Sequence, residues 1–112
     1  MLEHRRSPRY RASARAHIRG IMDGENLLKD ISLTGCCVES PVNADIQPGI
    51  QYQLDIEPEK SASVGNFQLL VEQKWKRPGE ISTEIGFLII ASPKGKQFQL
   101  YIDYLSYRNS AL

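Results

Sequence analysis

The residues best suited to hold a ligand lie near the N-terminus. Residues 3–11 (EHRRSPRYR) carry four of the fourteen basic side chains of the 112-residue chain. Each arginine presents a planar fork of N–H donors, which suits phosphate oxygens and the O6/N7 edge of guanine. A row of like charges also gives a segment little reason to fold by itself. We therefore expect residues 1–11 to form a flexible basic arm that docks onto an anion.

Within this arm, Arg5 and Arg9 can each offer a bidentate contact, and Arg6 adds positive charge beside them. His4 precedes them, and its imidazole can stack on a base or carry part of a positive charge near neutral pH. The three arginines are the predicted anion-binding half of a site, with His4 as a further candidate contact.

A second group of polar residues lies between two apolar segments, in residues 30–35 (DISLTG). The Asp30 carboxylate can accept from the N1–H and N2–H₂ donors of guanine, a donor pair that adenine lacks. Ser32 and the amide near Gly35 can complete the contact with the base edge. Gly35 suits a positive φ or a close backbone approach that a side chain would forbid. The same residue types also build ordinary turns, so this segment gains meaning from the arginines upstream.

The charge distribution limits the kind of ligand. The first twenty residues hold six arginines against Glu3 alone, whereas the remainder holds eight basic and twelve acidic side chains. Proteins that bind long nucleic acids usually spread positive charge over a face and have a high pI, but here the pI is about 7.8. We expect a small anionic ligand and no nucleic acid polymer.

Catalytic and metal sites are not indicated. Cys36 and Cys37 are adjacent, so on a strand they point to opposite faces and cannot easily bridge; we expect one buried thiol and one at the surface. Pairing either with His4 or His17 would need an activating context that the sequence lacks. No C-x-x-C or H-x-x-x-H spacing is present. We expect no enzyme activity, no metal and no cofactor.

Most of the chain has the alternating pattern of half-buried strands. It is clearest in residues 50–57, where apolar side chains alternate with Gln and acidic ones, and it recurs in 10–21, 25–31, 35–40, 62–76 and 83–90. Asp23-Gly24 is a favourable hairpin turn. Phe67, Leu69 and Val71 are predicted core positions in the long segment, with Trp75 as a further candidate.

The pattern changes period after Ser92. Ser92 is a suitable N-cap with Pro93 in the first helical position. Four apolar residues then recur at helical spacing, namely Phe98, Tyr101, Ile102 and Leu105. Such a stripe must be buried against something, and one open end of a barrel would serve. The sequence predicts an all-β fold: a small six-stranded antiparallel barrel in residues 12–112, capped by a C-terminal helix near 93–108.

The two polar groups together resemble the signature of PilZ domains. That family pairs RxxxR near the N-terminus with [D/N]xSxxG some twenty to thirty residues later, and here RRSPR is followed by DISLTG in that order. The resemblance extends over nearly the whole chain, because residues 84–87 (EIGF) look like the family's later glycine-aromatic strand.

This resemblance implies a bacterial, cytoplasmic receptor for the second messenger cyclic di-GMP. It places Arg5 and Arg9 in the first motif and Asp30, Ser32 and Gly35 in the second. Many members have another arginine where this chain has His4, a position linked to binding one ligand molecule or a stacked pair, so the stoichiometry stays open. Ligand binding would order the arm and change the affinity for a downstream protein partner. Direct membrane insertion is not expected, since no run of eighteen apolar residues occurs.

Two other functions are compatible with parts of this pattern. A PilZ-like barrel that no longer depends on nucleotide could dock to a protein, for example in pilus or flagellar machinery. Alternatively, the arginines could bind RNA or DNA nonspecifically, with Tyr10 as a stacking platform. Steep salt dependence and indifference to base identity would mark the latter.

Overall fold

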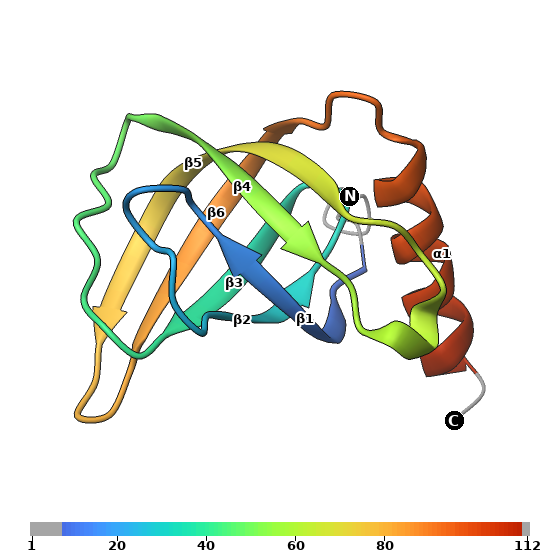
Figure 1. The fold of residues 1–112 in the computed structure, drawn as a ribbon, viewed down its shortest axis with the longest axis horizontal. Helices are drawn as coiled ribbons and strands as arrows, with labels where there is room; N and C mark the ends of the chain where they lie inside the picture. The colour runs from blue at the N-terminus through green and yellow to red at the C-terminus, as the bar shows by residue number, and fades with distance from the viewer. Residues whose placement is uncertain (1–7, 111–112) are drawn as a thin grey trace, which may run out of the picture.

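Six antiparallel strands close into a barrel, and one helix covers an end of it (Figure 1). The computed structural model describes residues 8–110. The strands are β1 (Tyr10–His17), β2 (Leu27–Ile31), β3 (Gly35–Ser40), β4 (Gln51–Glu57), β5 (Phe67–Pro78) and β6 (Thr83–Ala91); the helix is α1 (Lys96–Ser110). Around the barrel the order is β1-β2-β3-β6-β5-β4. The predicted fold class is therefore confirmed.

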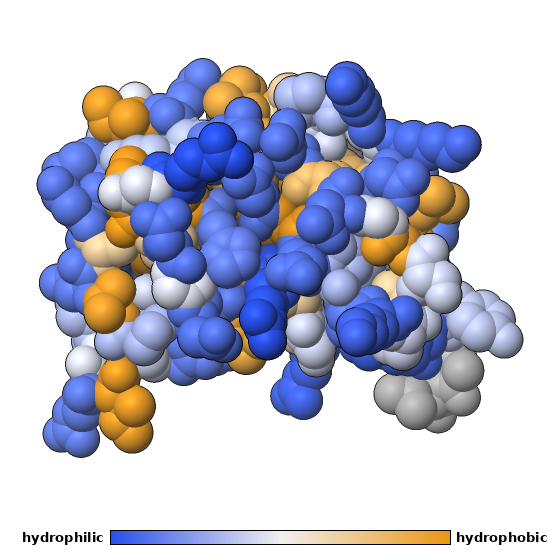
Figure 2. All heavy atoms as spheres, viewed as in Figure 1, coloured by the Kyte–Doolittle hydropathy of each residue, from blue (hydrophilic) through white to orange (hydrophobic). Residues whose placement is uncertain are grey.

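The alternation in the sequence determines which side chains fill the barrel. In β1 the alanines at 12, 14 and 16 are buried, while the arginines at 11 and 15 are exposed. Larger apolar residues from the other strands fill the interior beside these alanines, including Leu28, Val38, Leu54, Leu69, Val71 and Ile85. The outer surface seen in Figure 2 is correspondingly mostly hydrophilic.

Both ends of the barrel are closed by apolar side chains. Helix α1 covers the end on the right of Figure 1 with the predicted stripe, whose four members are at most 8% exposed. At the opposite end, Ala44 and Ile46 from the loop between β3 and β4 are buried in the same core. Burying a large apolar side chain contributes roughly 1.5–3 kcal/mol, so the residues that close the two ends also stabilise the barrel.

The turn between β1 and β2 differs from the prediction. The chain reverses at residues 18–22, where Ile18 and Met22 pair, and not at Asp23-Gly24. Gly20 supplies the left-handed conformation at φ 81°, and its N–H donates to both carboxylate oxygens of Asp23 at 3.0–3.1 Å. Asp23, which follows the turn, thus stabilises it through its side chain.

The predicted start of the helix was also wrong. Helix α1 begins at Lys96 and not at Pro93, because Lys94 adopts a left-handed conformation at φ 55° that interrupts a helix there. Ser92 is not an N-cap: its hydroxyl donates to the Gln68 carbonyl oxygen at 3.0 Å and ties the turn to β5. The helix continues to Ser110.

Candidate functional site

A groove of about 560 Å³ runs along the outside of β2, β3, β6 and β5. We call it the Asp30 groove. The charged side chains that line it are Arg9, Lys29, Lys74 and Arg77, with Asp30 and Glu84 as the acidic ones. Basic groups thus outnumber acidic groups by two to one among the charged residues of this lining. A groove of this size and charge suits an anionic ligand larger than a single phosphate.

Arg9, from the predicted arginine half of the site, and Asp30, from the predicted polar half, are in contact in this groove. The Arg9 guanidinium donates from Nη1 to Asp30 Oδ1 at 2.5 Å, although the two residues are 21 positions apart. Arg9 lies just before β1, and Asp30 belongs to β2, which pairs with β1. The pairing of these strands therefore brings the two motifs together. Both side chains remain partly exposed, at 51% and 30%, so a ligand can reach them.

Ser32 lies inside the turn that follows β2. Its hydroxyl oxygen accepts from the backbone N–H groups of Thr34 and Gly35, each at 3.1 Å, and the residue is 2% exposed. The Ser32 N–H also donates to the Gly35 carbonyl oxygen at 2.8 Å. Ser32 therefore shapes the turn between Asp30 and Gly35, and does not face the groove.

Gly35 is required by close packing. Its φ is not positive; instead, a Cβ at this position would lie 2.9 Å from the backbone oxygen of Phe87 and 3.4 Å from Arg9 Nη2. The first contact is with a neighbouring strand that cannot move easily. Of the two explanations open from the sequence, close backbone approach is the one observed.

Trp75 belongs to this groove and not to the core, which corrects the prediction. A bulge places Gln73 opposite Phe87 but Trp75 opposite Gly86, so the inside-outside alternation of β5 shifts there. Gln73 is buried and Trp75 is 41% exposed. The bulge cannot be read from the alternation itself, although the basic residues at 74, 76 and 77 around Trp75 are an untypical setting for a core position.

The Trp75 ring rests directly on Gly86. A Cβ at Gly86 would lie 2.2 Å from ring atoms of Trp75, so only glycine lets the indole lie against β6. The Arg77 guanidinium lies 4.9 Å from the centroid of the same ring, a cation–π geometry. An aromatic surface beside cationic groups can stack a nucleobase.

Lys29, Glu84 and Arg77 form an ion-pair group in the wall of the groove. Lys29 donates to one carboxylate oxygen of Glu84, and Arg77 Nη1 donates to the other at 3.2 Å. The hydrogen bond and charge of Lys29 lower the pKa of Glu84, and the same contact raises the pKa of Lys29. Sequence reasoning missed all three residues, because they are on different strands and share no motif.

The two cysteines are free, and both are buried, whereas one of them was expected at the surface. Cys36 faces the core, and Cys37 lies toward the groove but is only 7% exposed, so it is not a surface thiol. Burial, followed by the charge of Asp30, raises the pKa of Cys37 to about 11. The pKa of Cys36 is raised further by complete burial. A thiol held protonated is a poor nucleophile.

His4, Arg5 and Arg6 lie outside the described residues. Tyr10, the candidate stacking platform, is partly buried and packs against the core at the start of β1.

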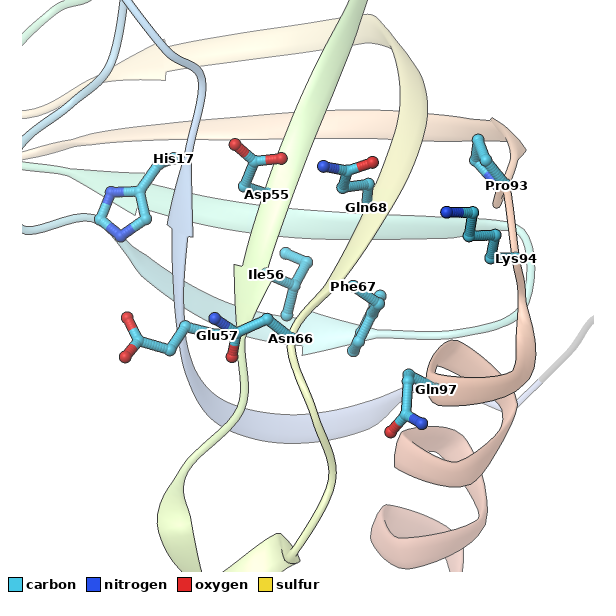
Figure 3. Close-up of a pocket in the computed structure, with 10 residues that line it drawn as sticks. All are labelled: His17, Asp55, Ile56, Glu57, Asn66, Phe67, Gln68, Pro93, Lys94 and Gln97. Carbon is cyan, nitrogen blue, oxygen red and sulfur yellow. The ribbon is translucent and has the colours of Figure 1, made fainter.

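A second groove, of about 460 Å³, lies between β1, β4, β5 and the turn before α1 (Figure 3). We call it the His17 groove. It contains two carboxylates, Asp55 and Glu57, against one cation, Lys94, and none of the predicted site residues. Part of its polar lining is already engaged, since Gln97 Oε1 accepts from the Gly65 N–H at 2.8 Å. This groove does not suit a phosphate.

Residues 8–110 contain no cluster of three or more His, Cys, Asp or Glu side chains placed to hold a metal ion. In the same part of the chain, α1 lacks the length and apolarity needed to cross a membrane. No curated protein sequence gives a significant match. The family model of the PilZ domain matches residues 3–105, which include both polar motifs and most of α1.

Proposed function

The chain belongs to the PilZ domain family, and from that premise we propose that it is a receptor for cyclic di-GMP, which binds in the Asp30 groove. PilZ is a family of binding and receptor domains, not of enzymes, and some members act without nucleotide. The observation that carries the proposal is the convergence of Arg9, Asp30 and Trp75 in one groove with excess positive charge.

In the proposed complex, Arg9 leaves Asp30 for a phosphodiester of the ligand. Asp30 then accepts from the N1–H and N2–H₂ groups of a guanine, and its preference for these donors selects guanine over adenine. Ser32 and Gly35 contribute by shaping the turn and by letting Arg9 approach. Arg5 and Arg6 are proposed to reach a phosphate as well, with His4 beside them.

Trp75 supports this proposal as a platform for the base. Its indole lies in the groove wall in contact with Gly86 and Arg77, and it is partly exposed. Stacking of one base on an aromatic side chain contributes about 1–3 kcal/mol. A guanine stacked there would leave its edge free to meet polar partners.

We infer that the signal leaves the protein through the arm. When Arg9 exchanges Asp30 for a ligand phosphate, the surface beside β1 changes, and a protein partner that recognises this surface would respond to the ligand. The receptor is proposed to act in the bacterial cytoplasm, in line with the family. The partner is a further protein of this signalling route.

The test is titration calorimetry of cyclic di-GMP against the wild type and Arg9→Ala, with cyclic di-AMP and GTP as competing ligands. We expect saturable binding that selects guanine and is lost in Arg9→Ala. Arg15→Ala is the matched control, because Arg15 is exposed on β1 outside the groove. Absence of binding to the wild type at near-millimolar ligand would favour the nucleotide-independent docking module.

A further inference from the structure

The Glu84 carboxylate occupies the place where two cationic side chains of the Asp30 groove converge. Lys29 comes from β2 and Arg77 from β5, and each donates to a different oxygen of Glu84 on β6. In the barrel order, β2 and β5 are three strands apart, a separation of roughly 14 Å at the backbone. Their long side chains therefore cross the groove wall to reach one anion.

The donors that bind this carboxylate are also the donors that bind phosphate. Ammonium and guanidinium groups pair with carboxylate and phosphate oxygens in similar geometry. The Lys29 and Arg77 side chains stay 40% and 71% exposed, so a ligand in the groove can reach both. Because its pKa is lowered by Lys29, Glu84 stays ionised at neutral pH.

Structural support is a weak reason for this arrangement. β2 and β6 are both paired with β3 along their backbones, so the strands are already held without the side chains. Partly exposed ion pairs contribute little to stability, because solvent screens them. The main consequence of Glu84 is electrostatic. Its negative charge offsets one of the four positive charges that line the groove, and its two oxygens accept hydrogen bonds from Lys29 and Arg77.

We propose that Lys29 and Arg77 form a second phosphate subsite in the Asp30 groove, and that Glu84 is an internal counter-ion that competes with the ligand for it. The inference rests on the proposed function. Cyclic di-GMP has two phosphodiester groups; Arg9 serves one of them, and Lys29 with Arg77 serves the other. Glu84 thereby sets the ligand concentration to which the receptor responds.

The test is the affinity of the full chain for cyclic di-GMP after Glu84→Gln, which keeps the size of the side chain and removes its charge. We expect binding to tighten about fivefold to tenfold, in the range that one partly desolvated charge contact supplies. Its salt dependence should also become steeper, since the ligand then meets a larger net positive charge that salt screens. Glu25→Gln, an equal change of charge in the exposed loop before β2, should stay within about twofold of wild type.

Arg77→Gln, made in both backgrounds, identifies the subsite. In the wild type we expect a change of at most about twofold, because Glu84 already engages this guanidinium. In Glu84→Gln the same substitution should remove most of the gain. A wild-type melting temperature verifies that Glu84→Gln is folded, and Glu84→Ala serves as a second variant with the same expected gain.

The two proposals fail in different ways. If the wild type binds and Arg9→Ala does not, yet Glu84→Gln and Glu84→Ala bind no tighter than wild type, the subsite is overturned and the receptor function stands. Weaker binding in both Glu84 variants would show that Glu84 positions the cations for the ligand, which also overturns the competition. If no form of the protein binds cyclic di-GMP, both proposals fall.

Discussion

Arg9 and Asp30, 21 residues apart in the chain, form an ion pair of 2.5 Å at the rim of the groove. The pair is partly exposed, so its contribution to folding is small, at about 0–1 kcal/mol. Its members nevertheless belong to the two motifs that would share the ligand. The pair therefore links the arm to the turn before any ligand is present.

Asp30→Ala should separate binding from stability. We expect cyclic di-GMP affinity to fall at least about tenfold, because the guanine donors lose their acceptor, while the melting temperature changes little. Calorimetry and thermal melting of one preparation measure both. Asp23→Ala is a useful contrast: it removes the carboxylate that holds Gly20, so it should lower stability and leave affinity unchanged. Affinity unchanged from wild type in a folded Asp30→Ala would contradict a ligand-binding role.

Trp75 should report directly on the groove, because it is the single tryptophan of the chain. Stacking of guanine on the indole should quench its fluorescence with the same midpoint as calorimetry. Gly86→Ala would place a Cβ within 2.2 Å of the ring, so the indole must leave β6. We expect altered emission in the free protein and weaker binding. An unchanged signal on saturation of the wild type would place the base elsewhere.

Gly35→Ala should destabilise the barrel by about 1–3 kcal/mol, the usual cost of forcing a group into a close-packed contact. The reason is the 2.9 Å approach of the new Cβ to the Phe87 carbonyl oxygen. Gly24→Ala is the control, because a Cβ there would meet no atom within 4 Å and the φ of Gly24 is not positive. Urea denaturation gives both free energies. Equal stability of the two variants would contradict the packing explanation.

The fold could be predicted from sequence because its determinants are local. Alternation in segments such as 50–57 and the helical spacing from Phe98 to Leu105 specify which faces are buried, and the barrel follows. The predictions that failed depended on non-local or backbone features. The bulge before Trp75 changes which side chains of β5 face the interior. The left-handed conformation of Lys94 makes the helix begin later than predicted. The pattern of apolar residues indicates neither feature.

The candidate site likewise contains residues that local sequence predicts and residues that only the folded structure brings together. Arg9 could be named from the chemistry of the basic arm. Asp30, Ser32 and Gly35 are close in sequence, and the resemblance joined them to Arg9 in one site. Lys29, Trp75, Arg77 and Glu84 come from three strands, and only the strand order places them in one groove. Ser32 was predicted to meet the ligand, and its hydrogen bonds instead favour a role within the turn.

Tyr101→Phe should weaken the attachment of α1 to the barrel. The buried Tyr101 hydroxyl donates to Glu59 Oε1 at 2.7 Å, and the Glu59 carboxylate also accepts from Arg108 at 3.4 Å. Losing a hydrogen bond to a charged group costs about 1.5–3 kcal/mol. Tyr107→Phe, at a position 78% exposed, should leave the free energy of unfolding unchanged. If Tyr101→Phe is equally neutral, the hydroxyl does not anchor the helix.

Stability should decline in alkaline solution, because burial raises the pKa of Cys37 from 9.0 to about 11 and raises that of Cys36 as well. Between pH 9 and 11 the unfolded chain loses thiol protons that the folded protein keeps, so deprotonation favours unfolding. Thermal melting from about pH 7 to 10.5 should show a falling melting temperature. Cys37→Ala should make this decline shallower, whatever its effect at neutral pH, since one of the titrating thiols is gone. Parallel pH profiles of the two proteins would contradict a raised pKa at Cys37.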